Sequence, residues 1–336
     1  MSVRLAACGK VFLAGEYAVL DPGRPALVVG IDRKLHATAA PADGLRIVHG
    51  PSGVAWDGGP APPELRFAVR AAQLAAAFCG GAADVRIIFE DDLAVEGRKL
   101  GLGGSAAASV LAVRAVCARA GRSAGDEEVI SLALAAHWAE QGGSGSGADV
   151  AAAALGGVLE VRSRIPWRSV DELMAIPAGQ IASSRPLEIR RVRVPARLRL
   201  LLADVGSPAN TRSLVREVRR FASGDPGRWA ERAGEISAVA EKLRNALEAN
   251  DAESALAAIR GGAAAMAALG EDAQAPIVTP ELSRACALAS AAGCAGKPSG
   301  AGGGDCAVIV AFSEKARERV EAALRPYFSV LRIAPA

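Results

Sequence analysis

Glycine-rich stretches in three separate parts of the 336-residue chain constrain its fold and ligands more than any other feature. They cover residues 9–17, 101–105 and 299–305. Glycine lets the backbone approach a ligand closely and adopt a positive φ, which turns successive N–H groups toward an anion. The central stretch leads into residues 105–113, which favour a helix, and a helix N-terminus attracts negative charge. Three such stretches, with Lys10 in the first, predict a site for a nucleotide and a second phosphorylated or anionic ligand.

The composition is that of an ordinary globular protein, with 51% hydrophobic and 22% charged residues. The net charge is only +3, from 39 Lys and Arg against 36 Asp and Glu, which argues against a nucleic-acid-binding protein that depends on neutralising phosphates. No run of apolar residues is long enough for a membrane span, and the N-terminus lacks the apolar core of a signal peptide. We therefore expect a cytoplasmic protein without a membrane partner. The six cysteines lack the paired spacing of a zinc site and are expected to be small buried residues.

The apolar pattern predicts a mixed α and β protein. Strands are expected over residues 3–8, 26–40, 85–89, 157–162, 187–194, 198–205, 308–310 and 328–333. Helices are expected over residues 64–78, 105–120, 126–140, 211–269 with breaks at 224–226 and near 250–251, 280–292, and from 313 onward. Residues 51–63 and 166–186 are expected to be irregular. The change near residue 206 from mixed strands to helices predicts an N-lobe of residues 1–205 and a C-lobe of residues 206–336 that share one cleft.

Two common nucleotide-binding motifs do not match. Lys10 follows Gly9 with no glycine five residues earlier, so the Gly-x4-Gly-Lys-[Ser/Thr] loop is missing. Nor does a Gly-x-Gly-x2-Gly sequence follow a strand near an acid that could bind ribose, which argues against a Rossmann site.

The ordered set of motifs resembles the GHMP kinases, the family of galacto-, homoserine, mevalonate and phosphomevalonate kinases. The family's first motif is similar to Cys8-Gly9-Lys10-Val11-Phe12-Leu13-Ala14-Gly15-Glu16-Tyr17-Ala18-Val19-Leu20, and its third to Lys297-Pro298-Ser299-Gly300-Ala301-Gly302-Gly303-Gly304-Asp305-Cys306. The second, usually Gly-Leu-Gly-Ser-Ser-Ala, is similar to residues 101–106, with Gly104 in place of the first serine. Because the motifs run from residue 8 to residue 306 in the family's order, the resemblance covers nearly the whole chain and is highly specific.

Three details are most similar to the branch of the family that phosphorylates 5-phosphomevalonate. Gly15-Glu16-Tyr17 stands where mevalonate kinases usually have Gly-Glu-His, and Gly304-Asp305-Cys306 stands where they tend to carry a further glycine. Gln141 and residues 145–152 are similar to the Gln-Gly…Gly-Ser-Gly-x-Asp-Val-Ala-Ala segment of that branch. The resemblance implies an α+β, two-lobed GHMP kinase fold, with an N-lobe like the βαβ unit of a ribosomal protein and a ferredoxin-like C-lobe.

For the nucleotide, the resemblance implies that the central loop wraps the phosphates of ATP from the N-terminus of the following helix. The residues assigned to this role are Lys99, Gly101, Leu102, Gly103, Gly104, Ser105 and Ala106. A solvated position is an equal alternative for Lys99. Ser105 would direct its hydroxyl toward phosphate or Mg²⁺, whereas Gly104 lacks the hydroxyl that many relatives carry. Glu140 lies near the segment that could add a metal-binding carboxylate, but we expect a solvated carboxylate at a helix end.

Lys10 and Asp149 are the predicted catalytic residues. Lys10 stands between Gly9 and the apolar residues 11–13, an unusual setting for a surface lysine, and in relatives this lysine faces the acceptor and the transferring phosphoryl group. Asp149 alone is equally well explained as a favourable charge in the first turn of a helix. Its match to the family's Gly-x-Asp position makes it a candidate base or orienter of the acceptor oxygen. A phosphate acceptor is already ionised near neutral pH, so Asp149 would mainly align Lys10.

An acceptor that carries its own phosphate needs additional hydrogen-bond donors. Besides Lys10, the candidates are Tyr17, Ser144, Ser146, Ser207, Thr211, Arg212, Ser299, Gly300 and Ala301. Arg212 could grip a phosphate or carboxylate with two N–H groups, although a helix-surface arginine is an equal alternative. Residues 207–211 could instead simply cap a helix. His137, next to Trp138, is expected to pack rather than to catalyse.

The activity that the resemblance implies is ATP- and Mg²⁺-dependent phosphorylation of 5-phosphomevalonate to 5-diphosphomevalonate, by a monomer or homodimer. The nearest alternatives are mevalonate kinase, whose alcohol acceptor would need Asp149 as a base, and another small-molecule kinase of the family. An alternative of a different class is a non-catalytic nucleotide or metabolite sensor. The retention of Lys10, Ser105 and Asp149 argues against a sensor.

Overall fold

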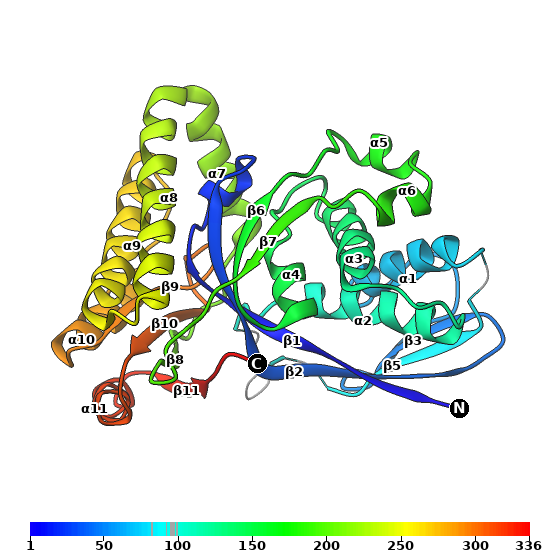
Figure 1. The fold of residues 1–336 in the computed structure, drawn as a ribbon, viewed down its shortest axis with the longest axis horizontal. Coiled ribbons are helices and arrows are strands. Elements are labelled where there is room, and N and C mark those ends of the chain that lie inside the picture. The colour runs from blue at the N-terminus through cyan, green and yellow to red at the C-terminus, as the bar shows by residue number, and fades with distance from the viewer. Residues whose placement is uncertain (82, 92, 95–97, 99) are drawn as a thin grey trace.

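The computed structural model describes residues 1–81, 83–91, 93–94, 98 and 100–336, which form two β-sheets with helices packed against them (Figure 1). The first sheet contains β1 (Val3–Ala14), β2 (Pro25–Pro41), β3 (Leu45–His49), β4 (Val54–Trp56), β5 (Val85–Phe89), β6 (Gly157–Ser163) and β7 (Leu187–Arg191). The second contains β8 (Arg199–Asp204), β9 (Ala295–Pro298), β10 (Cys306–Ala311) and β11 (Ser329–Ile333).

The first sheet has the order β4-β3-β5-β2-β6-β7, and β1 pairs with β2 outside this path. Strands β3 and β5 are parallel, and α1 (Arg66–Phe78) lies between them in the chain, which gives the expected βαβ unit. The sheet is accompanied by α2 (Gly104–Arg119), α3 (Asp126–Glu140), α4 (Ala148–Leu155), α5 (Val170–Met174), α6 (Ala178–Ala182) and the short 3₁₀ helix η1 (Ala18–Leu20). Helices α1 to α4 pack together beside the sheet (Figure 1).

The second sheet is antiparallel and has the order β11-β8-β10-β9. Its helices are α7 (Thr211–Gly224), α8 (Pro226–Glu248), α9 (Ala252–Asp272), α10 (Pro280–Ala291) and α11 (Glu314–Leu324). Four helices separate β8 from β9, and α11 separates β10 from β11, so the chain follows the βαββαβ course of a ferredoxin-like fold. The fold expected from the sequence is therefore confirmed.

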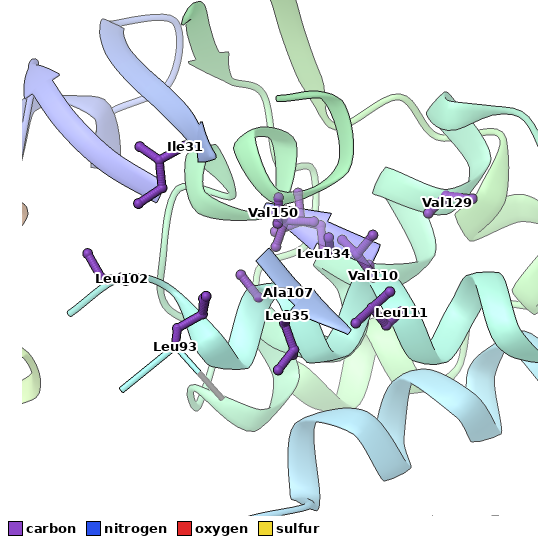
Figure 2. Close-up of a cluster of buried hydrophobic side chains, with 14 of the residues drawn as sticks. Ile31, Leu35, Leu93, Leu102, Ala107, Val110, Leu111, Val129, Leu134 and Val150 are labelled. Atoms are coloured by element: carbon purple, nitrogen blue, oxygen red, sulfur yellow. The ribbon is translucent and has the colours of Figure 1, made fainter. Parts of the chain in front are cut away.

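Helix α2 is the centre of the largest core cluster. Its apolar residues are spread around the helix rather than confined to one face, as expected for a helix largely enclosed by other elements. Figure 2 shows side chains of α2 beside those of β2, α3 and α4, including Leu35, Ala107, Val110, Leu111, Leu134 and Val150. Burial of each Val or Leu side chain contributes about 1.5–3 kcal/mol. This packing fixes the direction of α2, and hence the place to which its N-terminus points.

The helix breaks predicted from the sequence occur where an aspartate begins the next helix. Asp225 caps α8 by accepting a hydrogen bond from the Arg228 N–H at 2.9 Å. Asp251 caps α9 in the same way, from the Ser254 N–H at 3.1 Å. A side-chain cap of this kind stabilises a helix start by about 1 kcal/mol.

The structure differs from the local expectations in the first glycine-rich stretch and in the two segments expected to be irregular, because tertiary pairing outweighs local composition. The first glycine-rich stretch is not a loop up to Ala14, since β1 runs through Gly9 and Lys10 while paired with β2, with a bulge between Cys8 and Gly9. Strand β4 lies within residues 51–63, and α5 and α6 lie within 166–186, where irregular structure was expected. The chain leaves the first sheet after β7 and enters the second at β8, and the expected boundary at residues 205 and 206 follows β8 directly.

A search of the described residues for membrane spans finds no helix with the length and apolar character needed to cross a bilayer.

A buried ion pair connects the two sheets. The Glu16 carboxylate, just after β1, accepts a hydrogen bond from the Lys297 ammonium of β9, and the two side chains are only 4% and 0% exposed. The Lys297 ammonium also donates to the Pro298 carbonyl oxygen at 2.6 Å. Because a buried charge without a partner is strongly unfavourable, each of these residues requires the other.

We predict that Lys297→Met lowers the free energy of unfolding by about 3–5 kcal/mol, because it leaves the Glu16 carboxylate buried without its partner. Urea denaturation followed by circular dichroism measures this change. The matched control is Arg185→Met, which removes an ion pair with Glu127 whose side chains are 73% and 66% exposed, and should change stability by less than about 1 kcal/mol. The double variant Glu16→Leu/Lys297→Met should be more stable than Lys297→Met alone. Equal effects of Lys297→Met and Arg185→Met would contradict this account.

Candidate active site

The site lies where β1, the loop before α2 and the loop between β9 and β10 meet. The Lys10 backbone N–H donates to the Leu102 carbonyl oxygen at 2.8 Å, and the Lys10 ammonium donates to the Gly101 carbonyl oxygen at 2.6 Å. The same ammonium lies 3.9 Å from the position that a Cβ atom would occupy on Gly300. Lys10 therefore joins all three glycine-rich motifs. Among the residues that the structure describes, only the Gly101 carbonyl oxygen accepts from its ammonium, which leaves two of its three N–H donors for a ligand.

The N-terminus of α2 has the backbone features of an anion-binding site. Gly101 and Gly103 have φ angles of 66° and 84°, in the left-handed region, so the chain turns sharply just before the helix begins at Gly104. Gly103 is the residue at the N-cap position and has no side chain with which to cap the helix. The first N–H groups of α2 are thus available to oxygen atoms of a phosphate, and the helix dipole favours their negative charge.

The space around this loop explains its glycines. A Cβ atom on Gly101 would lie 2.5 Å from the Asp305 Oδ2 atom, and one on Gly103 would lie 2.8 Å from the Lys10 Cγ atom. A Cβ atom on Gly104 would meet nothing within 4 Å. The absence of the usual serine at residue 104 is therefore not required by protein packing.

Ser105 and Asp149 are brought together by His137. The Ser105 Oγ atom, in the first turn of α2, lies 3.0 Å from His137 Nε2, which lies 3.9 Å from Asp149 Oδ2 in the first turn of α4. His137 itself is buried in α3, and its ring stacks at 4.9 Å on that of Phe67. Burial lowers the pKa of the His137 imidazole; the Asp149 charge raises it, and the Lys10 and Arg66 charges lower it.

Asp305 is a further carboxylate at this meeting point. Its Oδ1 atom accepts a hydrogen bond from the Ala209 N–H at 3.1 Å, and its φ of 56° is in the left-handed region. Burial raises the pKa of the Asp305 carboxyl group above its usual value, while the Ala209 N–H and the Lys10 ammonium act in the opposite direction. Asp305 thus connects the β9–β10 loop to the turn between β8 and α7.

Tyr17, a predicted acceptor ligand, is turned into the protein. Its side chain is 4% exposed, and its hydroxyl donates to the Ala301 carbonyl oxygen at 2.5 Å. Burial and the Glu16 and Glu217 carboxylates raise the pKa of the Tyr17 phenol. The Ser299 Oγ atom, on the same loop, accepts a hydrogen bond from the Phe12 N–H at 3.4 Å. These two contacts hold the β9–β10 loop against β1.

The other predicted acceptor ligands lie on two turns. Ser144 donates to the Gln141 carbonyl oxygen at 3.0 Å, and buried Ser146 accepts from the Ala148 N–H at 3.4 Å, so both hydroxyls stabilise the turn before α4. Ser207, Thr211 and Arg212 are exposed around the start of α7, where Asn210 is the capping residue. Lys99 lies outside the described residues.

Sequence reasoning missed the positions of His137 and Asp305 in the site. A signal existed for His137, because it is the polar residue near the end of the apolar stretch 129–138, and buried polar groups require partners. For Asp305 the signal was a carboxylate that follows three glycines. Glu140, expected to be a solvated carboxylate at a helix end, is instead mostly buried and pairs with Arg70 at 2.8 Å. In the described part of the chain, no group of three or more His, Cys, Asp or Glu side chains could hold a metal ion.

Comparison with known proteins identifies the class to which this arrangement belongs. Residues 66–157 match the family model for the GHMP kinases N terminal domain, and residues 243–329 match that for the GHMP kinases C terminal. The chain is also 33% identical to a curated protein over 92% of its own length. The chain belongs to the GHMP kinase family.

That curated relative is the phosphomevalonate kinase of Streptomyces sp. (strain CL190), of which 90% is covered. A similar solved structure is that of Streptococcus pneumoniae phosphomevalonate kinase in complex with phosphomevalonate and AMPPNP, with a TM-score of 0.89, 22% identity, and coverage of 99% of this chain and 100% of that one. The structure of L. major mevalonate kinase in complex with R-mevalonate has a TM-score of 0.72, 20% identity, and coverage of 98% and 95%.

We predict that Gly103→Ala lowers kcat/KM by about 100-fold, because its Cβ atom would displace the Lys10 side chain from the position it takes in the site. The strain of a left-handed alanine should also cost about 1–2 kcal/mol of stability. Gly104→Ser is the matched control, since it restores the usual family residue in open space and should retain activity. Steady-state kinetics and thermal unfolding of both variants test this prediction. Equal kcat/KM values for Gly103→Ala and Gly104→Ser would refute it.

Proposed function

We propose that this protein transfers the γ-phosphoryl group of ATP to the phosphate of 5-phosphomevalonate, giving ADP and 5-diphosphomevalonate in the mevalonate pathway of isoprenoid biosynthesis. The observation that carries the proposal is the position of the Lys10 ammonium between the loop before α2 and the β9–β10 loop. The 33% identity to a phosphomevalonate kinase over most of both chains supports this acceptor.

The backbone at the start of α2 would bind the phosphates of ATP. Residues 101–106 offer N–H groups at a helix N-terminus, and this end of α2 is held in place by the packing of the rest of the helix. In phosphoryl transfer most of the catalysis comes from positioning and from stabilising charge on the equatorial oxygens, so a rigid cradle of donors is the main requirement.

Lys10 would stabilise the phosphoryl group in transfer and the acceptor phosphate. Both are negatively charged, so a cation between them reduces their repulsion as the oxygen atom of the acceptor attacks. The hydrogen bond to the Gly101 carbonyl oxygen fixes the ammonium in place before substrates arrive. Such preorganisation avoids a reordering cost during the reaction.

Asp149 would orient groups around the acceptor rather than remove a proton. An acceptor phosphate is ionised near neutral pH, so its attacking oxygen needs no general base. The Asp149 Oδ1 atom accepts a hydrogen bond from the Val150 N–H at 3.0 Å, which fixes the carboxylate at the start of α4. An alcohol acceptor, as in mevalonate kinase, would instead require Asp149 to take the proton.

The side chains at the start of α2 and α4 fit Mg²⁺ in their chemistry. Mg²⁺ prefers oxygen ligands and is usually bound by one or two protein groups together with substrate phosphates and water. We propose Ser105 as a protein ligand, and the nearby Asp149 carboxylate adds negative charge on the same side. When bound, Mg²⁺ would neutralise charge on the β- and γ-phosphates of ATP.

We further propose that the enzyme acts in the cytoplasm. Its six cysteines are all free thiols, which suits a reducing compartment.

We also propose a set of residues that surround 5-phosphomevalonate. They lie on the two turns and on the β9–β10 loop: Ser144, Ser146, Ser207, Thr211, Arg212, Ser299, Gly300 and Ala301.

An ADP-release assay with Mg²⁺ and ATP, supplied with 5-phosphomevalonate and mevalonate in parallel, tests the proposed reaction. We expect turnover with 5-phosphomevalonate and not with mevalonate. Turnover with mevalonate alone would move the enzyme one step earlier in the pathway and make Asp149 a general base. If folded protein binds ATP but shows no turnover with either acceptor, the proposed reaction is wrong, and another GHMP substrate or a sensor remains.

Lys10→Met should lower kcat with 5-phosphomevalonate by about 10²–10³-fold, because it removes a charged donor that acts in the transition state. Asp149→Asn should cost much less with this acceptor, since the amide can still orient neighbouring groups. Lys315→Met, at an exposed lysine of α11, is the control and should leave kcat unchanged. A larger loss from Asp149→Asn than from Lys10→Met would contradict the division of roles.

A further inference from the structure

His137 is placed as a bridge between two predicted site residues on different helices. Its Nε2 atom is 3.0 Å from the Ser105 Oγ atom of α2 and 3.9 Å from the Asp149 Oδ2 atom of α4. The imidazole is buried in α3 and rests on Phe67. A side chain that only filled space would not need to direct its polar atom at two polar groups of the site.

The Nε2 atom of the His137 ring faces one hydroxyl group and one carboxylate. Burial disfavours the charged form and lowers the pKa of His137. The charged groups that act on the ring are Asp149, which raises the pKa, and Lys10 and Arg66, which lower it. A neutral imidazole carries one proton, so Nε2 is either a donor or an acceptor toward Ser105.

The two tautomers of His137 leave the Ser105 hydroxyl with different hydrogen-bonding roles. If Nε2 accepts, the Ser105 hydroxyl donates its proton in the hydrogen bond to His137 and has no proton left to donate to a ligand. If Nε2 donates, the Ser105 oxygen accepts and its own proton is free. Asp149 favours the tautomer with a proton on Nε2, because its carboxylate attracts an N–H and repels a lone pair at that atom. Of the three charges that act on the ring, that of Asp149 has the largest effect.

We propose that His137 is a positioning residue whose Nε2–H donates to the Ser105 oxygen, so that the Ser105 hydroxyl donates its proton to a phosphate oxygen of the nucleotide. One lone pair of the Ser105 oxygen then remains for a cation. The role toward the nucleotide rests on the proposed function, whereas the tautomer of His137 does not. By bridging α2 and α4, His137 also keeps the Ser105 hydroxyl from turning toward the Asp149 carboxylate.

The tautomer is measured directly by ¹⁵N NMR of the imidazole nitrogens. The chain has three histidines, and the variant His36→Gln/His49→Gln leaves only the signals of His137. Both replaced residues lie outside the site, His36 paired with Asp91 and His49 with Ser52. We expect a protonated Nε2 near neutral pH, with the Nε2 shift altered by Ser105→Ala. An unprotonated Nε2 would overturn the proposal whether or not the enzyme has the proposed activity.

The kinetic test compares two replacements of His137. Glutamine can place an amide N–H near the position of Nε2, whereas leucine fills the buried space without a donor. We expect His137→Gln to retain kcat/KM for ATP within about tenfold and His137→Leu to lose about 100-fold, the scale of one lost donor. A packing role predicts the reverse order, because leucine suits an apolar site better than an amide does.

A double-mutant cycle separates this role from general destabilisation. If His137 acts through Ser105, the losses in His137→Leu and Ser105→Ala should not add, and the double variant should be no worse than about the larger single loss. Thermal unfolding of each variant shows that the protein measured is folded. Fully additive losses in folded protein would overturn the proposal.

Discussion

The buried contact between Glu16 and Lys297 is the constraint on which the site depends. It joins the residue after β1 to strand β9, so the first and third glycine-rich motifs are fixed relative to each other from inside the protein. Charges excluded from water keep their partners, since separating them would leave each one buried and unpaired. The Tyr17 hydrogen bond to Ala301 and the Phe12 hydrogen bond to Ser299 add two further contacts between the same two segments. These contacts together hold the β9–β10 loop against β1.

In the proposed mode of binding, recognition of phosphate is left largely to the backbone. The turn at Gly101 and Gly103 would direct peptide N–H groups toward the phosphates, and α2 would supply its dipole from within the core. Lys10 adds the charge that the backbone lacks, and it does so from a strand rather than from a flexible loop. A strand residue has less freedom to move, so the ammonium is better positioned than a loop lysine would be.

The sequence was sufficient to predict features with local causes. The helix breaks at Asp225 and Asp251 follow from capping chemistry, and the order of the glycine motifs indicated the family and hence the fold. Features with distant causes were not predictable in this way. Strand β1 continues to Ala14 because β2 pairs with it, and Tyr17 turns inward because Ala301 lies beside it. The apolar stretch around His137 indicated that its ring needs partners but not which ones, since Ser105 and Asp149 reach it from two other helices.

The backbone conformation of Asp305 lowers the stability of the protein. A left-handed backbone conformation costs an L-residue about 1–2 kcal/mol, and the φ of 56° at Asp305 is in that region. Glycine would adopt it without strain, but would lack the carboxylate that accepts a hydrogen bond from the Ala209 N–H and lies next to Gly101. Replacement of Asp305 by glycine would therefore relieve backbone strain but lose the hydrogen bond that connects the β9–β10 loop to the turn before α7. A stabilised form of this enzyme should be designed with that aspartate kept unchanged, because the strain is local whereas the contact joins two separate segments.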